Sequence, residues 1–179
     1  MNRVGILTFH SANNFGALLQ AVSLQKTIVE RGNMECELID YEPEFIRKDY
    51  SISPFKNKHP KAIIKSALRI PDKIKRNSKF QAFRVENTVC SKQCQNEDDF
   101  QSICNSFDEI IVGSDQVWNY NLTEHDMHYF LLEIDASVKK AAYAASTGGA
   151  DFSLKESNKM IQCLQEFRHI SVRESASKT

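Results

Sequence analysis

The sequence has no excess of charge of either sign. Its 179 residues contain 23 Lys and Arg and 23 Asp and Glu, so the formal net charge at neutral pH is zero. Domains that bind nucleic acid over a broad surface usually carry a clear basic excess, and we therefore expect no nucleic-acid partner. The hydrophobic and charged fractions, 41% and 26%, are close to those of soluble globular proteins and argue against a disordered or fibrous chain.

Motifs for metal and nucleotide binding are missing as well. The five cysteines include no Cys-x-x-Cys pair, and His125 and His128 have no third ligand at metal-binding spacing. We therefore expect reduced thiols and no metal site. The sequence contains neither a Gly-x-Gly-x-x-Gly series nor a P-loop, which leaves it without the usual fingerprints of dinucleotide and nucleoside triphosphate binding.

A long apolar segment is also lacking. Residues 4–25 carry no formal charge, but polar side chains interrupt the segment, and burying them in lipid would be costly. The apolar stretch 4–9 is shorter than the ~7–15 residues of a signal-peptide core. We therefore expect a cytoplasmic protein.

Charge is nevertheless segregated along the chain. Residues 43–92 contain 13 Lys and Arg but only 4 Asp and Glu. Such a segment is typical of a solvated helical face. Alternatively, it forms a basic patch that contacts an anionic surface, such as phospholipid or a polyprenyl-phosphate headgroup. In that case the protein would lie at the periphery of the inner membrane face.

Hydrophobic periodicity predicts alternating strands and helices. We expect strands at 3–9, 35–41, 109–113, 140–145 and 170–173, and helices at 15–31, 98–106 and 154–167. Two more helices are expected within 43–92. One has apolar residues spaced on positions 63, 67 and 70, and the other runs from 72 to about 88. This alternation predicts an α/β fold with a Rossmann-like, doubly wound and mostly parallel sheet. We expect a single domain over residues 1–179, with a basic helical insertion at about 43–92.

Polar residues follow the ends of predicted strands, where ligands bind in open α/β sheets. Asn13, Asn14 and Gly16 lie at the amino terminus of the helix expected at 15–31, which we expect to end at Gly32. The free N–H groups there favour an anion or a sugar oxygen. The same residues would equally serve as an ordinary helix cap.

A second cluster follows the strand expected at 109–113. Ser114, Asp115 and Gln116 stand beside Trp118, the only tryptophan. This combination suits a sugar, because an indole stacks on the sugar ring while polar groups bind its hydroxyls. Alternatively, Asp115 caps a turn and Trp118 packs in the core.

Three other residues complete the candidate site. Ser146 ends a predicted strand among small residues that would admit a ligand or form an ordinary loop. Arg173 closes the last predicted strand. His10, after the first strand, is either a proton shuttle or a satisfied structural residue.

Four segments of the sequence resemble motifs of one family. Residues 5–21 (GILTFHSANNFGALLQA), 112–119 (VGSDQVWN), 139–146 (KKAAYAAS) and 170–174 (ISVRE) resemble, in this order, the polysaccharide pyruvyl transferase family. The resemblance implies the amino-terminal half of a glycosyltransferase-B-like architecture. The second domain of that architecture is expected to be absent from these residues and to be supplied by further chain or by a partner chain.

The resemblance also implies an activity. Members of the family transfer the pyruvyl group of phosphoenolpyruvate, a donor substrate that needs no cofactor, to a sugar of a bacterial cell-surface polysaccharide as a ketal. A protein of this kind would act in exopolysaccharide biosynthesis, with a sugar or a lipid-linked oligosaccharide as acceptor. Two alternatives stay open: a non-catalytic glycan-binding or assembly module, and half of a nucleotide-sugar glycosyltransferase.

Within such an activity, the candidate residues take distinct expected roles. Asp115 would be the general base or would orient the sugar. Asn14 and Gln116 would bind hydroxyls, and Trp118 would be the stacking platform. Arg173 would attract the donor phosphate or hold the face between domains.

Overall fold

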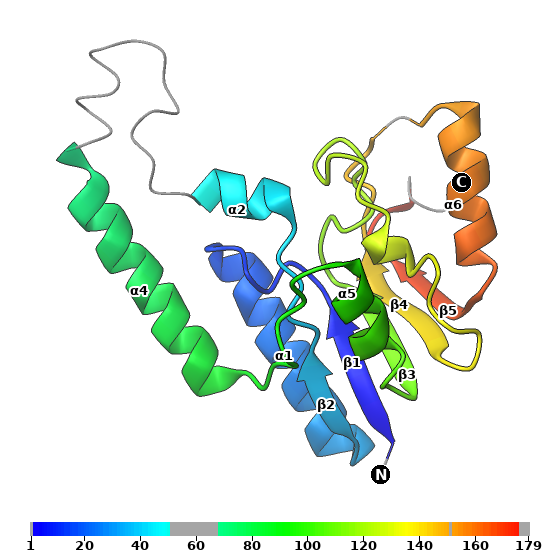
Figure 1. The fold of residues 1–179 in the computed structure, drawn as a ribbon, viewed down its shortest axis with the longest axis horizontal. Helices are drawn as coiled ribbons and strands as arrows, with labels where there is room; N and C mark the ends of the chain where they lie inside the picture. Colours follow the sequence, from blue (N-terminus) through cyan, green and yellow to red (C-terminus); the bar gives the residue numbers. More distant parts are fainter. Residues whose placement is uncertain (1, 51–67, 151, 176–179) are drawn as a thin grey trace.

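One parallel sheet organises the molecule. The computed structural model describes residues 2–50, 68–150 and 152–175, and in them five strands run parallel in the order β2-β1-β3-β4-β5 (Figure 1). The strands are β1 (Arg3–Leu7), β2 (Glu35–Leu38), β3 (Glu109–Gly113), β4 (Lys139–Ala145) and β5 (Phe167–Val172). The prediction of an α/β fold with a parallel sheet is thereby confirmed.

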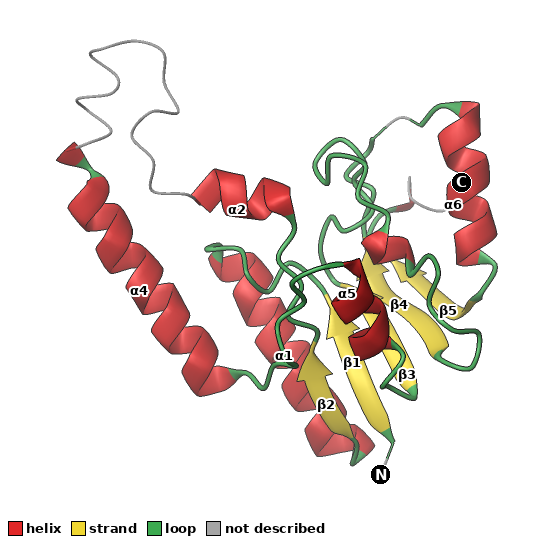
Figure 2. Ribbon diagram, viewed as in Figure 1, coloured by secondary structure: helices red, strands yellow, loops and turns green. Residues whose placement is uncertain are grey.

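Helices lie on both faces of this sheet. They are α1 (Phe15–Gly32), α2 (Glu44–Tyr50), α4 (Ile70–Asn87), α5 (Glu97–Cys104), the short η2 (His128–Phe130) and α6 (Leu154–Leu164). Figure 2 shows α1 behind the sheet and α5 in front of it. Ile6 of β1 accordingly packs with Ala21 of α1, whereas Leu7 packs in a different cluster with Phe100 of α5. Right-handed crossovers require this arrangement, because the chain moves outward to β2 through α1 and back to β3 through α5.

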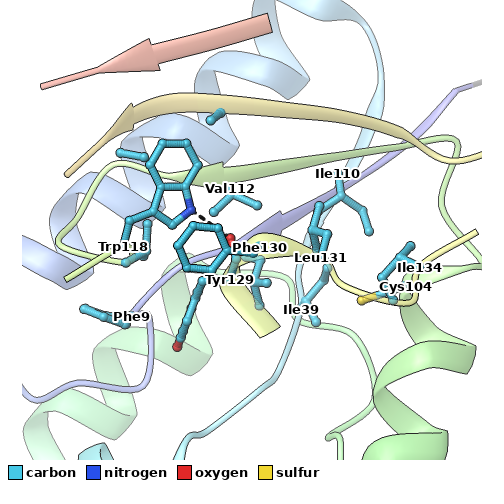
Figure 3. Packing of buried hydrophobic residues seen from close by; sticks show 14 of the residues in the cluster. Phe9, Ile39, Cys104, Ile110, Val112, Trp118, Tyr129, Phe130, Leu131 and Ile134 are labelled. Carbon is cyan, nitrogen blue, oxygen red and sulfur yellow. Dashed lines mark hydrogen bonds between the residues drawn. The ribbon is translucent and has the colours of Figure 1, made fainter. Parts of the chain in front are cut away.

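The larger core lies on the α5 face (Figure 3). The segment 114–138 between β3 and β4 has little regular structure besides η2, yet Tyr129, Phe130 and Leu131 within it are almost fully buried. They share one cluster with Ile110 and Val112 of β3. Burial of these apolar side chains therefore holds the irregular segment after β3 against the sheet.

Asparagine residues bound α1 at both ends. Oδ1 of Asn14 accepts hydrogen bonds from the backbone N–H groups of Gly16, at 2.8 Å, and Ala17, at 3.3 Å. At the other end the helix includes Gly32, and Asn33 adopts the left-handed conformation, with φ 49° and ψ 45°. The predicted stop at Gly32 was one residue early, because the short polar side chain of asparagine also tolerates this conformation.

The basic segment contains a long helix. α4 confirms the helix predicted from residue 72 to about 88, and it packs on α1 through Phe80. The other predicted helix has positions 63 and 67 outside the described residues. α2 was not predicted, although Phe45 and Ile46 within it are buried. No helix in the described ranges is both long enough and apolar enough to cross a membrane.

Candidate functional site

The loops after all five strands meet at one edge of the sheet, because the strands are parallel. The strand order reverses between β1 and β3, which is the usual position of ligands in this topology. Two polar groups occupy this edge. One, which we call the strand-end cluster, comprises Ser114, Asp115, Gln116, Ser146, Arg173 and Glu174 after β3, β4 and β5. The other lies after β1 and β2 and is described below.

Ser146 is the centre of the strand-end cluster. Its side chain is fully buried, and its Oγ donates to Oε1 of Glu174 at 2.8 Å and accepts from Nη2 of Arg173 at 3.1 Å. Its backbone N–H donates to the carbonyl oxygen of Asp115 at 3.0 Å. The structure thus brings together Asp115, Ser146 and Arg173, which are far apart in the sequence.

Asp115 is the carboxyl group best suited to proton transfer in this cluster. It is half-buried, and its Oδ1 accepts the backbone N–H of Gln116 at 2.7 Å. Burial raises the pKa of Asp115, although the Gln116 hydrogen bond and the charge of Arg173 act in the opposite direction. A carboxylate with a raised pKa accepts a proton more readily near neutral pH.

Two glycines shape the loops around Asp115. Gly113 has φ +125°, and a Cβ atom there would lie 2.4 Å from the carbonyl oxygen of Tyr143. Gly148 has φ +62°, and a Cβ atom there would lie 2.4 Å from Nδ2 of Asn119 and 2.8 Å from Oε1 of Gln116. Both positions therefore require glycine, and Gly148 lets the Gln116 side chain pack directly under the loop after β4.

Trp118 does not lie in an open site. Its side chain is 3% exposed, and its Nε1 donates to the carbonyl oxygen of Tyr129 at 2.9 Å. Its ring stacks on Phe130 with centroids 5.7 Å apart (Figure 3). The structure therefore does not support Trp118 as a platform for a sugar, and the alternative interpretation, packing in the core, describes it.

The first loop serves to cap α1 and to anchor α4. Oδ1 of Asn14 accepts the hydrogen bond of the Gly16 N–H in the cap described above. Nδ2 of Asn13 donates to Oδ1 of Asn77 in α4 at 2.9 Å. Within the described ranges, no hydrogen bond joins Asn13 or Asn14 to the strand-end cluster. The candidate residues therefore fall into two groups rather than one.

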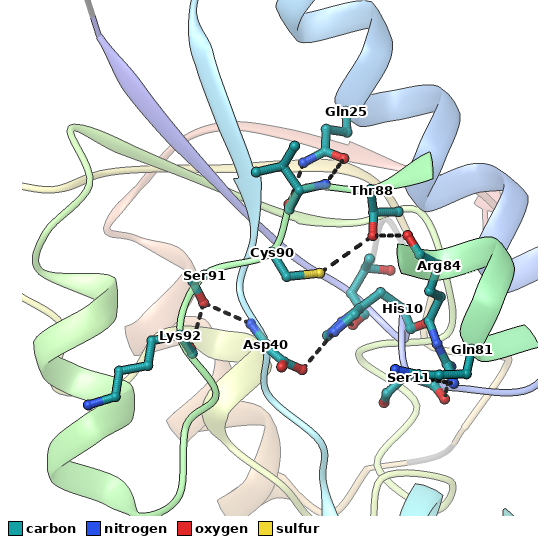
Figure 4. A network of polar contacts seen from close by, with 12 residues as sticks. His10, Ser11, Gln25, Asp40, Gln81, Arg84, Thr88, Cys90, Ser91 and Lys92 are labelled. Carbon is teal, nitrogen blue, oxygen red and sulfur yellow. Dashed lines mark hydrogen bonds and ion pairs between the residues drawn. The ribbon is translucent and has the colours of Figure 1, made fainter. Parts of the chain in front are cut away.

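A pocket of about 410 Å³ lies after β1 and β2, under α4. We call it the α4 pocket, and Figure 4 shows its polar network. At its centre Nε2 of His10 lies 3.2 Å from Oδ1 of Asp40, while Nδ1 of His10 lies 3.3 Å from the carbonyl oxygen of Thr8. Its lining residues are His10, Ser11, Asp40, Glu42, Gln81, Arg84, Val85, Thr88, Cys90 and Gln93.

Arg84 closes the α4 pocket by tying α4 to the loop after β1. Its Nη1 donates to the carbonyl oxygen of Ser11 at 2.5 Å, and its Nη2 donates to Oδ1 of Asn13 at 3.3 Å. Burial lowers the pKa of Arg84, while the carboxylates of Glu42 and Asp40 raise it. Sequence reasoning considered His10 but missed Asp40 and Arg84. A usable signal was present for Asp40, since it lies near the carboxyl end of the strand predicted at 35–41.

His125 and His128 do not meet, although they are close in sequence. Nε2 of His128 lies 2.8 Å from Oε2 of Glu97, and its Nδ1 lies 2.5 Å from Oδ1 of Asp126. His125 pairs instead with Glu156 at 3.5 Å. His128 therefore belongs to a polar network that links α5 to the segment before η2.

Comparison with known proteins identifies the family of the chain. The family model described as polysaccharide pyruvyl transferase matches residues 14–179. No curated protein and no solved structure matches the chain. The match covers the strand-end cluster and most of the sheet. The chain therefore belongs to the polysaccharide pyruvyl transferase family.

Proposed function

We propose that the protein takes part in transfer of the pyruvyl group of phosphoenolpyruvate to a sugar, forming a ketal. In this reaction the enol CH₂ group gains a proton, one sugar hydroxyl adds to the adjacent carbon, and a second hydroxyl displaces phosphate. Each hydroxyl loses its proton, so a base is needed near the acceptor. Family membership, together with a half-buried carboxyl group at the ligand-binding edge of the sheet, supports the proposal.

In this proposal the residues of the strand-end cluster divide the work. Asp115 accepts the hydroxyl proton, since burial raises its pKa. Arg173, whose side chain is 44% exposed, attracts the phosphate or carboxylate of the donor. Ser146 and Glu174 hold the guanidinium in place through hydrogen bonds. Gln116 binds hydroxyls of the acceptor, and a second domain or partner chain completes the donor site.

Replacing Asp115 tests the proposed base. We expect Asp115→Asn to lower the rate of pyruvyl transfer by ~10²–10⁴-fold, because a positioned general base contributes about that much. The assay measures phosphate released from phosphoenolpyruvate in the presence of acceptor sugars. Asp135→Asn, an exposed position before β4, is the matched control and should keep the parent rate. An unchanged rate in Asp115→Asn would rule out the base.

The product of the assay also separates the alternative functions. Release of nucleotide from a nucleotide sugar, with no phosphate from phosphoenolpyruvate, would identify a glycosyltransferase half. Sugar binding measured by calorimetry without turnover of either donor would identify a glycan-binding module.

The basic segment supports a further part of the proposal, contact with an anionic membrane. Lys75, Arg76 and Lys79 are exposed on α4, which packs on α1 through Phe80. We call these three residues the basic face of α4. Such a face is attracted to anionic headgroups, and it would bring the protein to lipid-linked acceptors at the inner membrane face.

A further inference from the structure

The α4 pocket has no role in the function proposed above. We propose that it binds an uncharged sugar unit, with Asp40 and Glu42 accepting hydrogen bonds from its hydroxyls and Ser11 donating one. The proposal concerns binding alone, so it holds whether or not the strand-end cluster transfers a pyruvyl group.

The position and size of the pocket suit a small ligand. It lies at the carboxyl ends of β1 and β2, and its volume of about 410 Å³ falls within the range of small-molecule sites. In Figure 4 the side chains of His10 and Asp40 point toward each other, and those of Ser11, Gln81 and Arg84 gather beside them. The pocket is thus polar on several sides.

Asp40 is held in place for binding. His10, which is 2% exposed, lies 3.2 Å from Oδ1 of Asp40, whose own side chain is 32% exposed. The backbone of Asp40 is also fixed, because its N–H donates to Oγ of Ser91 at 3.0 Å and its carbonyl oxygen accepts the N–H of Cys94 at 3.0 Å. A carboxylate that is both oriented and accessible can accept a hydrogen bond from a ligand without first reorganising.

Ser11 supplies an independent sign of a missing partner. Its Oγ is buried and has no hydrogen-bond partner among the residues that the structure describes. Buried hydroxyl groups in proteins are almost always hydrogen-bonded. Because Ser11 lines the pocket, rotation of its short side chain would bring Oγ to a bound hydroxyl group.

The charges of the lining favour an uncharged ligand over an anion. Arg84 is a lining cation that could bind a phosphate group. Its guanidinium, however, already donates hydrogen bonds to Ser11, Asn13 and Gln81 within the protein. The carboxylates of Asp40 and Glu42 would repel an anion, while Arg84 offsets part of their attraction for a cation. Apart from Val85 and Cys90, every lining side chain carries nitrogen or oxygen, so an apolar ligand is also disfavoured. Sugar hydroxyls, which both donate and accept, match this surface.

Cys90 makes the proposal testable without any activity assay. It lines the pocket and is exposed, whereas Cys94 is half-buried and lies outside the lining. Alkylation by iodoacetamide is measured at both sites by mass spectrometry, at alkaline pH because the surrounding protein partly desolvates both thiols and raises their pKa. The probes are methyl glucoside, methyl galactoside and N-acetylglucosamine, compared with glucuronate and inorganic phosphate.

We expect at least one uncharged sugar to slow alkylation of Cys90 in a saturable way and to leave Cys94 unchanged. Protection by none of these sugars, up to their solubility limits, would overturn the proposal. Stronger protection by phosphate or glucuronate would overturn the assigned ligand class.

Variants then locate the binding groups. Asp40→Asn should raise the sugar concentration for half-maximal protection by about tenfold or more, since hydrogen bonds to charged groups contribute on that order. Glu42→Gln, at an exposed position, should raise this concentration several-fold. Glu42→Gln keeps the test decisive if Asp40→Asn fails to fold. Asp115→Asn should leave protection unchanged, so loss of pyruvyl transfer and loss of sugar binding are separable. Equal protection in the parent protein, Asp40→Asn and Glu42→Gln would refute the site.

Discussion

Lys140 offers the sharpest test of how the fold is held together. Its side chain is 2% exposed, and its Nζ donates to the carbonyl oxygens of Leu131, at 3.2 Å, and Ile134, at 3.0 Å, and pairs with Glu166. These contacts join β4 to the segment before it and to the turn between α6 and β5. Lys140→Met keeps most of the buried chain length and removes only the ammonium group.

The expected cost follows from those contacts. Each hydrogen bond from a charged group contributes ~1.5–3 kcal/mol. The carbonyl oxygen of Ile134 would lose its donor inside the core, whereas that of Leu131 would keep the longer bond, 3.4 Å, from the Ile134 N–H. Glu166 is 57% exposed, so its loss of a partner costs under about 1 kcal/mol. Removing the buried charge also relieves part of its desolvation penalty. We therefore expect a loss of about 2–4 kcal/mol in the free energy of unfolding, or roughly 4–16 °C in Tm for a domain of this size.

Urea unfolding followed by circular dichroism measures this difference. Lys139→Met is the matched control, because the neighbouring residue in β4 is only half-buried, and its loss should stay within about 0.5 kcal/mol. If Lys140→Met and Lys139→Met unfolded at the same urea concentration with the same slope, the reasoning about Lys140 would be refuted.

Two further predictions concern pH and membranes. Burial acts to lower the pKa of His128, but Asp126 and Glu97 outweigh it and raise the pKa above 6.5. The imidazolium therefore stabilises the fold fully below pH 6.5 and loses this contribution as the pH rises through the raised pKa. The free energies of unfolding of the parent protein and His128→Phe should differ most below pH 6.5. A difference that stays constant with pH would contradict the assignment. For the basic face of α4, sedimentation with anionic vesicles should fall as salt rises, and triple substitution to Gln should abolish it. Equal binding to neutral vesicles would remove this proposal.

Local patterns in the sequence were enough to predict the fold class and the family. Strand β3 and helices α1, α4 and α5 form close to where periodicity places them, because hydrophobic spacing and caps such as Asn14 act over a few residues. The four motifs likewise indicated the family that the family model shows. The grouping of Ser146 and Arg173 near Asp115 followed from one topological rule, since parallel strands end at one edge.

Only the tertiary structure showed that the polar candidates form two groups and that Trp118 is buried. Residue type could not place Trp118, because an indole serves equally well in a core and in a sugar site, and packing against Phe130 settled it. The α4 pocket joins His10 to Asp40, 30 residues away, and Ser11 to Arg84, 73 residues away. Such contacts depend on how helices cross the sheet, and neither periodicity nor motif spacing carries that information.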